Sequence, residues 1–301
     1  MRIGLFGGDT ANRTIDDIVG AAKAAADDGF AIYALPQIFA MEALSVLAIV
    51  GREVPNIELG TGVVPPYPRH PVTMAQEALT AQAASNGRLI LGIGLSHQMV
   101  IENMFKTSFD KPVRHMREYL SVLMPLLHQR AVDYSGETLG AQVAIGIAPV
   151  VPAPPVLVAA LGTQMLKITG ELADGTITWM TGPQTLGNHT IPTINAAAQK
   201  AGRPAPKISV SLPVCVTNDP DKARETAAVE FQVYGFLPSY RAMLDREGAE
   251  GPGDVAICGD ENTVEKGIRQ LADIGVTEFV ASVFGTKEDR SRTRAVLKSL
   301  L

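Results

Sequence analysis

The chain has 301 residues, of which 46% are hydrophobic, enough to bury a large core as one α/β domain or as two smaller ones. Its net charge of -5 leaves no basic footprint, so we expect a small-molecule partner and no nucleic acid. Cys215 and Cys258 are the only cysteines, too few for a disulfide framework or a cysteine-built zinc site. We expect both to be buried thiols in a reducing cytoplasm.

Short apolar runs alternate along the chain with longer stretches of helical spacing. The helix over 14–29 has Asp16 and Asp17 in its first turn and Gly29 at its end, and 263–280 repeats the order helix, glycine, strand. The runs are apolar almost continuously, which is typical of parallel strands covered on both faces. The predicted strands are 2–7, 31–36, 57–63, 89–95, 156–162, 175–180, 207–216 and 277–284.

Eight such units with a closing helix over 286–300 predict one (β/α)8 TIM barrel domain over residues 1–301. A doubly wound open sheet is the alternative. Two insertions interrupt the repeat: 130–153, with hairpin-like turn residues, and 235–256, an irregular and mobile-looking excursion. Insertions of this kind often form lids over a barrel site.

Neither the uncharged stretch 143–162 nor the N-terminus predicts a membrane or export segment. A helix over 143–162 is excluded by its four prolines, each of which costs about 3 kcal/mol in a helix interior. The N-terminus has only a four-residue apolar run, far short of a signal peptide. The prolines are Pro149, Pro152, Pro154 and Pro155.

Barrel chemistry is expected just after the C-terminal end of each strand. Glycine is frequent there, where it either forms turns or lets a flat ligand approach the backbone. The residues at these positions are Gly7 and Gly8, Pro36 and Gln37, Gly62 to Val64, Ser96 and His97, Gly162 and Thr163, Trp179 and Met180, Thr217 and Asn218, and Gly285.

The stretch "GIGLSH" (92–97) does not match a dinucleotide fingerprint, because His97 stands where the third glycine belongs. Glu118 lies at about the spacing of the ribose-binding acid, but inside a helical pattern. A better anion site follows Gly162, where Thr163 can cap a helix and the free amides of residues 163–165 can face a phosphate, with Lys167 assisting. An ordinary helix cap explains the same residues.

The five histidines are scattered, with no spacing that predicts a metal site, and no hydrolase elbow or P-loop is present. Chemistry is therefore expected from a bound organic cofactor.

Four stretches in this order resemble the luciferase-like monooxygenase superfamily, and most of all its actinobacterial branch that uses the deazaflavin coenzyme F420. They are "ELGTGVVPPYPRHP" (58–71), "GRLILGIGLSH" (87–97), "AALGTQMLKITGELADGTITWM" (159–180) and "GIRQLADIGVTEFV" (267–280). The resemblance implies a (β/α)8 barrel with the deazaflavin in its mouth, and a possible homodimer.

The resemblance also assigns residues to the cofactor. A non-proline cis bond is implied at Gly62-Val63, behind the ring. Leu95, Ser96 and His97, after Gly94, would line the ring edge. The phosphate would lie at Ala160, Leu161, Gly162 and Thr163, and Gly7 and Gln37 would belong to the same mouth. Trp179 and Met180 would form the wall, although core packing also explains Trp179.

The chain departs from related deazaflavin sugar-phosphate dehydrogenases in two places. Pro36-Gln37 stands where they have an acidic-histidine pair, and His97 where they have a glutamate. Since Gln37 cannot titrate, base-assisted alcohol oxidation there is not expected. His97 is the candidate catalytic residue, as a proton donor beside the ring, but a hydrogen bond to cofactor or substrate, or no special role, stays open.

The leading hypothesis is an enzyme that transfers a hydride between F420 and a small organic substrate, reducing an activated C=C or C=O. One alternative is an FMN-dependent luciferase-like monooxygenase. Another is a barrel that binds F420 or flavin without catalysis.

Overall fold

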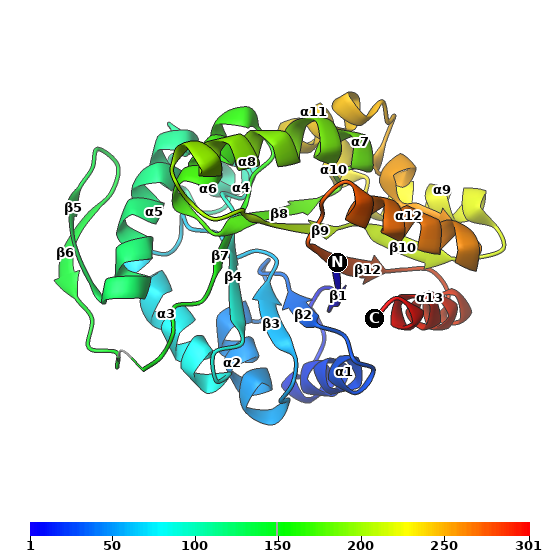
Figure 1. Cartoon of the computed structure of the whole chain (residues 1–301), viewed down its shortest axis with the longest axis horizontal. Helices are drawn as coiled ribbons and strands as arrows, with labels where there is room; N and C mark the ends of the chain where they lie inside the picture. Colours follow the sequence, from blue (N-terminus) through cyan, green and yellow to red (C-terminus); the bar gives the residue numbers. More distant parts are fainter. Residues whose placement is uncertain (149) are drawn as a thin grey trace.

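The computed structural model of the chain describes residues 1–148 and 150–301, so Pro149 lies outside the described residues. Parallel strands close into a barrel, because the first and the last of them also pair with each other. Figure 1 shows these strands at the centre. In barrel order they are β1 (Arg2–Phe6), β2 (Ile32–Leu35), β3 (Glu58–Thr61), β4 (Leu89–Ile93), β7 (Val156–Ala159), β8 (Gly175–Trp179), β9 (Lys207–Ser211) and β12 (Glu278–Val283).

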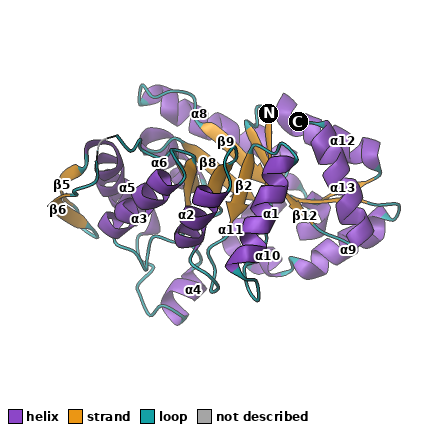
Figure 2. Ribbon diagram, turned by 90° about the horizontal axis from the view of Figure 1, so that it is seen from below, coloured by secondary structure: helices purple, strands orange, loops and turns teal. Residues whose placement is uncertain are grey.

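The eight strands that close this barrel, counted over the described ranges, confirm the TIM barrel and rule out the open doubly wound sheet. Helices surround the strands on the outside (Figure 2). They are α1 (Ile15–Asp27), α2 (Ala43–Glu53), α3 (Pro71–Ala84), α4 (Gln98–Asn103), α5 (Pro112–Gln129), α6 (Thr163–Leu172), α7 (Pro183–Thr185), η1 (Leu186–Thr190), α8 (Ile191–Lys200), α9 (Pro220–Glu230), α10 (Val233–Phe236), α11 (Pro238–Glu247), η2 (Pro252–Val255), α12 (Glu261–Asp273) and α13 (Lys287–Ser299).

The near-continuous hydrophobicity of the strands serves two cores, because alternate residues of a strand point to opposite faces. One set fills the barrel interior: Ile32, Ala34, Ile90, Leu157 and Val280, with Phe6 and Ile177 against them. The other set packs outward under the helices, as Leu35 and Leu91 do, both fully buried. This second core is the larger one and stabilises the helical layer by apolar burial.

The run 207–216, expected as one strand, is divided in the structure. β9 ends at Ser211, and β10 (Pro213–Val216) begins after Leu212. Proline lacks the N–H that would continue the ladder, so the pairing changes there. β10 leaves the barrel beside the far end of β12 and pairs with β11 (Ile257–Gly259), a strand that the sequence did not predict.

The two cysteines are buried thiols, as expected. Cys215 and Cys258 occupy partner positions on β10 and β11 and are 1% and 3% exposed. Burial raises the pKa of Cys215 to about 11 and that of Cys258 to about 12, so both stay protonated at neutral pH.

The first insertion is the hairpin that its turn residues predicted. β5 (Ala131–Ser135) and β6 (Gly140–Ala144) pair antiparallel at the outer edge of the molecule, beside α5 (Figure 1). The carboxylate of Glu118 on α5 accepts hydrogen bonds from the amides of Glu137, Thr138 and Leu139 in the turn. Burial would raise the pKa of Glu118, but these bonds and the Thr138 hydroxyl outweigh it, and the pKa lies below its usual value. Glu118 is therefore a structural anchor of the hairpin.

The second insertion is helical, not the irregular excursion expected for 235–256. α10, α11 and η2 occupy most of it, with Gly248 closing α11 in a left-handed conformation. Pro238 begins α11 at a position where its missing N–H costs nothing. Over the described ranges, no helix has the length and apolarity needed to cross a membrane.

Candidate functional site

The carboxyl end of the barrel has walls of different character. Phe6 at the end of β1 and Trp179 at the end of β8 lie with ring centroids 6.3 Å apart and planes 20° apart. Small residues end or follow the neighbouring strands β3, β4 and β7: Gly62 comes directly after β3, Gly94 directly after β4, and Ala159 ends β7. A Cβ added at Gly94 would lie 2.9 Å from the Cβ of Ala159. The mouth therefore has an aromatic wall and a wall made largely of backbone.

The backbone after β3 is bulged as the resemblance implied, and the peptide bond Gly62-Val63 is cis. The amide of Gly62 donates to Leu35 O at 2.7 Å, and that of Val64 donates to Gly92 O at 2.9 Å. Val63 lies over Gly94, whose added Cβ would be 2.7 Å from Val63 Cγ2. A Cβ added at Gly62 would lie 2.9 Å from Phe6 Cε2, so Gly62 has no room for a side chain either. The two glycines are required by close packing at the mouth.

The chain turns sharply after β4 and brings His97 to the mouth. Ser96 adopts a left-handed conformation, with φ of 63°, and His97 is the N-cap of α4. Within the described chain, the ring of His97 makes no cap hydrogen bond. Burial lowers the pKa of His97, so its imidazole is neutral at pH 7. Leu95, Ser96 and His97 are all partly accessible, and their contact with a cofactor stays a prediction.

His97 is the first member of an aromatic row that crosses the mouth. Its ring lies 5.8 Å from that of Tyr240, which lies 4.9 Å from Tyr234. Tyr234 and Phe231 then meet the edge of Trp179 at 5.8 and 5.5 Å. α10 and α11 (233–247) therefore form a roof over the mouth, the position expected for this insertion.

The helix after β7 presents free amides beside the same mouth. α6 begins after Gly162, which is the N-cap; Thr163 is the first helical residue and not the cap that the sequence predicted. The first hydrogen bond of the helix is donated by the amide of Leu166 to the carbonyl oxygen of Gly162. In the part of the chain that the structure describes, the amides of Thr163, Gln164 and Met165 have no acceptor. Residues 162–164 are exposed, so an anion can reach these donors.

The next helix start is closed instead. The carboxylate of Glu247 on α11 accepts hydrogen bonds from the amides of Gln184 and Thr185 at 3.0 and 2.7 Å. A Cβ at Gly182 would lie 2.3 Å from the Glu247 Cδ, so this carboxylate fills the space. The protein's own anion thus holds the α7 start, and α6 is the start left open for a ligand.

Five predicted site residues have structural roles or lie in the core. Gln37 accepts a hydrogen bond from the amide of Ala43 through Oε1, and so supports the start of α2. The carbonyl of Gly7 accepts from Arg13 at 2.7 Å. Met180 and Ala160 are fully buried in the core, so Met180 does not form a pocket wall as expected. Leu161, whose carbonyl is bound by His189 Nε2 at 2.9 Å, leads the chain to the open helix start.

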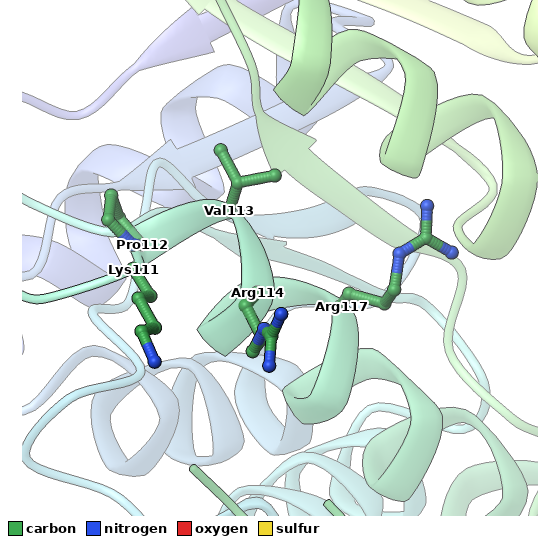
Figure 3. Close-up of a pocket in the computed structure, with 5 residues that line it drawn as sticks. All are labelled: Lys111, Pro112, Val113, Arg114 and Arg117. Carbon is green, nitrogen blue, oxygen red and sulfur yellow. The ribbon is translucent and has the colours of Figure 1, made fainter. Parts of the chain in front are cut away.

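A separate surface cavity of about 490 Å³ lies at the start of α5, lined by Lys111, Pro112, Val113, Arg114 and Arg117 (Figure 3). Its positive charges already have partners. Lys111 and Arg114 pair with Glu137, and Arg117 pairs with Glu171 at 2.6 Å. This cavity is outside the barrel mouth and is not the candidate site. Across the described ranges, no group of three or more His, Cys, Asp or Glu side chains could hold a metal ion.

Sequence reasoning missed the residues that the roof and the inner wall supply. They are Phe6, Ala159, Phe231, Tyr234 and Tyr240. Phe6 and Ala159 carried a signal, since both lie near a predicted strand end. Tyr240 lies in the insertion 235–256 that was expected to cover the site, but no pattern singled out this residue. Phe231 and Tyr234 carried no signal, because their approach to the mouth depends on the return of α9 from β10.

Comparison with known proteins agrees with this architecture. The family model of luciferase-like monooxygenases matches residues 2–278. A 5,10-methylenetetrahydromethanopterin reductase of Methanolobus tindarius is 27% identical over 281 residues, 82% of this chain and 84% of the relative. The structure of the coenzyme F420 dependent tetrahydromethanopterin reductase from Methanopyrus kandleri superposes with a TM-score of 0.79 at 23% identity, covering 99% and 96% of the two chains.

A flavin enzyme shares the same architecture. The oxygenating constituent of 3,6-diketocamphane monooxygenase of Pseudomonas putida, solved with FMN, superposes with a TM-score of 0.77 at 16% identity. That match covers 99% of this chain and 96% of the other. At this identity it speaks for the fold, and the match over residues 2–278 carries the family. The chain belongs to the luciferase-like monooxygenase family.

Proposed function

We propose that the protein is a coenzyme F420-dependent oxidoreductase that transfers a hydride between the deazaflavin and a small organic substrate, reducing an activated C=C or C=O. The observation that carries the proposal is the open anion-binding helix start beside a mouth with one aromatic wall and one wall made largely of backbone. A cofactor with a planar ring and a phosphate would use both features.

The residues present fit such a group. The unpartnered amides of 163–165 form a cradle of donors for a phosphate. Gly62 and Gly94 bring the backbone after β3 and β4 into close packing, since an added Cβ at either would lie within 3.0 Å of a neighbour. This closely packed surface, with no side chain at either glycine, is the one against which a planar ring would lie.

Each residue then has a definite task. The start of α6 would hold the phosphate, the bulge at Gly62-Val63 would support the ring, and Leu95 and Ser96 would border its edge. The bound deazaflavin supplies the hydride chemistry. His97 would hold a proton at its imidazole N–H for transfer at this site, and the roof would exclude water from it.

Two other functions are each favoured by one observation. An FMN-dependent monooxygenase is favoured by the shared architecture with the FMN-bound Pseudomonas enzyme. A barrel that binds the cofactor without catalysis is favoured by Gln37, which cannot titrate and already serves Ala43.

The experiment uses Trp179, the only tryptophan of the chain, as a reporter in the mouth. Purified protein is titrated with F420 and with FMN, following Trp179 emission and the cofactor's own fluorescence. We expect saturable quenching by F420 at micromolar concentrations. The variant Trp179→Phe is the control, since it removes the protein signal and keeps the cofactor signal. Tight FMN binding without F420 binding would overturn the proposal.

A further inference from the structure

The geometry points to the substrate class: we propose that the mouth accepts a planar, uncharged, conjugated carbonyl compound, and that Tyr240 on the roof determines this preference. The inference rests on the proposed function, because it takes the small-residue wall to be occupied by the cofactor. The substrate then lies against the opposite, aromatic wall.

The first argument is the shape of that wall. Trp179 meets Phe231 edge-on at an interplanar angle of 82°, and Tyr234 at 76°. Tyr240 meets Tyr234 at 76°, so successive rings alternate in orientation along the row. Trp179, Tyr234, Tyr240 and His97 are each partly accessible. Such a wall favours another flat π-system, which it can contact by edge and by face.

The second argument is that the wall carries hydrogen-bond donors suited to a neutral carbonyl oxygen. The indole N–H of Trp179 is buried; it lies beside the hydroxyl of Tyr234 but makes no hydrogen bond of good geometry within residues 1–148 and 150–301. Burial raises the pKa of Tyr240, so its hydroxyl stays protonated and can donate. Neutral His97 offers a further N–H. Tyr240 and His97, which are partly accessible, are therefore the donors that a neutral carbonyl oxygen would meet.

The third argument is charge. Three arginines near the mouth already serve the chain itself. Arg13 donates to the carbonyls of Gly7 and Asp17, and Arg69 lies between Glu42 and Glu77. Arg241, next to Tyr240, binds Asp245 and the carbonyls of Ala249 and Glu250. An anionic substrate would be desolvated at the aromatic wall without one of these cations as partner, which is costly.

The surface around the mouth is also apolar, like the aromatic wall inside it. The loop after β2 exposes Ile38 and Phe39, at 54% and 63%, and the segment after β4 exposes Met104 and Phe105, at 57% and 38%. The rings of Phe39 and Phe105 lie 6.1 Å apart. A substrate that extends beyond the aromatic row therefore meets further apolar contact.

The roof holds Tyr240 in place before any ligand binds. Glu247, at the end of the same helix, is fixed by the amides of Gln184 and Thr185. The hydroxyl of Thr185 also donates to Met243 O at 3.3 Å. α11 is thus tied to the end of β8, which carries Trp179, and the aromatic row is preorganised.

The test compares three ligands of similar size by calorimetric titration, against the protein alone and against the protein saturated with F420. They are benzylideneacetone, a planar neutral enone; trans-cinnamate, planar and anionic; and 4-phenyl-2-butanone, neutral with a saturated link. We expect the enone to bind the F420-loaded protein at least about tenfold more tightly than either of the others. Tyr240→Ala is expected to weaken enone binding about three- to tenfold, and Tyr240→Phe to keep the ring contribution.

Tyr134→Phe, on the distant hairpin, is the matched control and is expected to change nothing. Equal or tighter binding of cinnamate, no measurable enone binding, or unchanged enone affinity in Tyr240→Ala would each overturn the inference. A variant that fails to fold is recognised by its melting curve, and the ligand order in the wild-type protein then decides. Failure of the proposed function is distinguishable, because it appears as absent F420 binding in the cofactor titration without these ligands.

Discussion

Replacing Thr163 by proline removes one amide donor from the start of α6 and leaves the helix itself intact. The first helical position favours proline, whose missing N–H has no helical acceptor there. The preceding Gly162, with φ of -76° and ψ of 151°, already has the extended conformation that precedes proline. A hydrogen bond from an amide to a charged group contributes about 1.5 to 3 kcal/mol, so F420 should bind roughly 10- to 100-fold more weakly.

The assay is the F420 titration followed by cofactor fluorescence, with a melting curve for each variant. Thr163→Ala is the matched control, because it removes the hydroxyl but keeps the amide, and it should bind F420 within about threefold of the wild type. The deazaflavin riboside that lacks the phosphate should bind the wild type and Thr163→Pro equally well. If Thr163→Pro melts like the wild type and keeps its F420 affinity, the start of α6 does not bind the phosphate.

Two further substitutions test the mouth. Gly94→Ala should destabilise the protein by about 1 to 3 kcal/mol and weaken F420 binding, because the added Cβ would press on Val63 and Ala159. Gly20→Ala is the control, since its Cβ would meet no described atom within 4 Å. It should be neutral or stabilising in thermal melts. Since burial lowers the pKa of His97, the unfolded state binds a proton more readily, and stability falls as the pH drops through and below the ordinary value of 6.5. His97→Gln should lose less stability than the wild type between about pH 7.5 and pH 5.5; an equal loss in both proteins would contradict the burial of this ring.

The fold could be predicted from the sequence because its signals are local. Apolar runs, capping residues and glycine stops recur along the chain. The closing helix α13 begins at Lys287, and Thr286 before it forms a capping box with Asp289. The prediction of a single strand over 207–216 was wrong. Val214 and Val216 are as apolar as the barrel residues before them, so hydrophobicity alone does not show where the barrel strand ends. Only the lost N–H of Pro213, together with pairing to the distant β11, divides the run.

The site could be predicted in part, for the same reason. Ser96 and His97 follow a strand directly, so their place at the mouth comes from local sequence and the barrel rule. Tyr234 and Tyr240 lie about a hundred and forty residues further along, and their contacts depend on α9 returning to the mouth and on Glu247 meeting α7. No spacing within the roof encodes those contacts, because they are tertiary.

The two helix starts at the mouth differ in how their first amides are satisfied. The carboxylate of Glu247 accepts hydrogen bonds from the first amides of α7. The partial positive charge of this helix start, near Trp179, is therefore already neutralised by the protein. The α6 start has no acceptor for its first amides in the described chain, so a ligand anion is favoured there. If a cofactor phosphate is held on the β7 side, as we propose, its planar ring would be directed toward the small residues of β3 and β4. The aromatic wall would then be left to the substrate, and the roof that carries Tyr240 is held in place by Glu247, the same residue that occupies the α7 start.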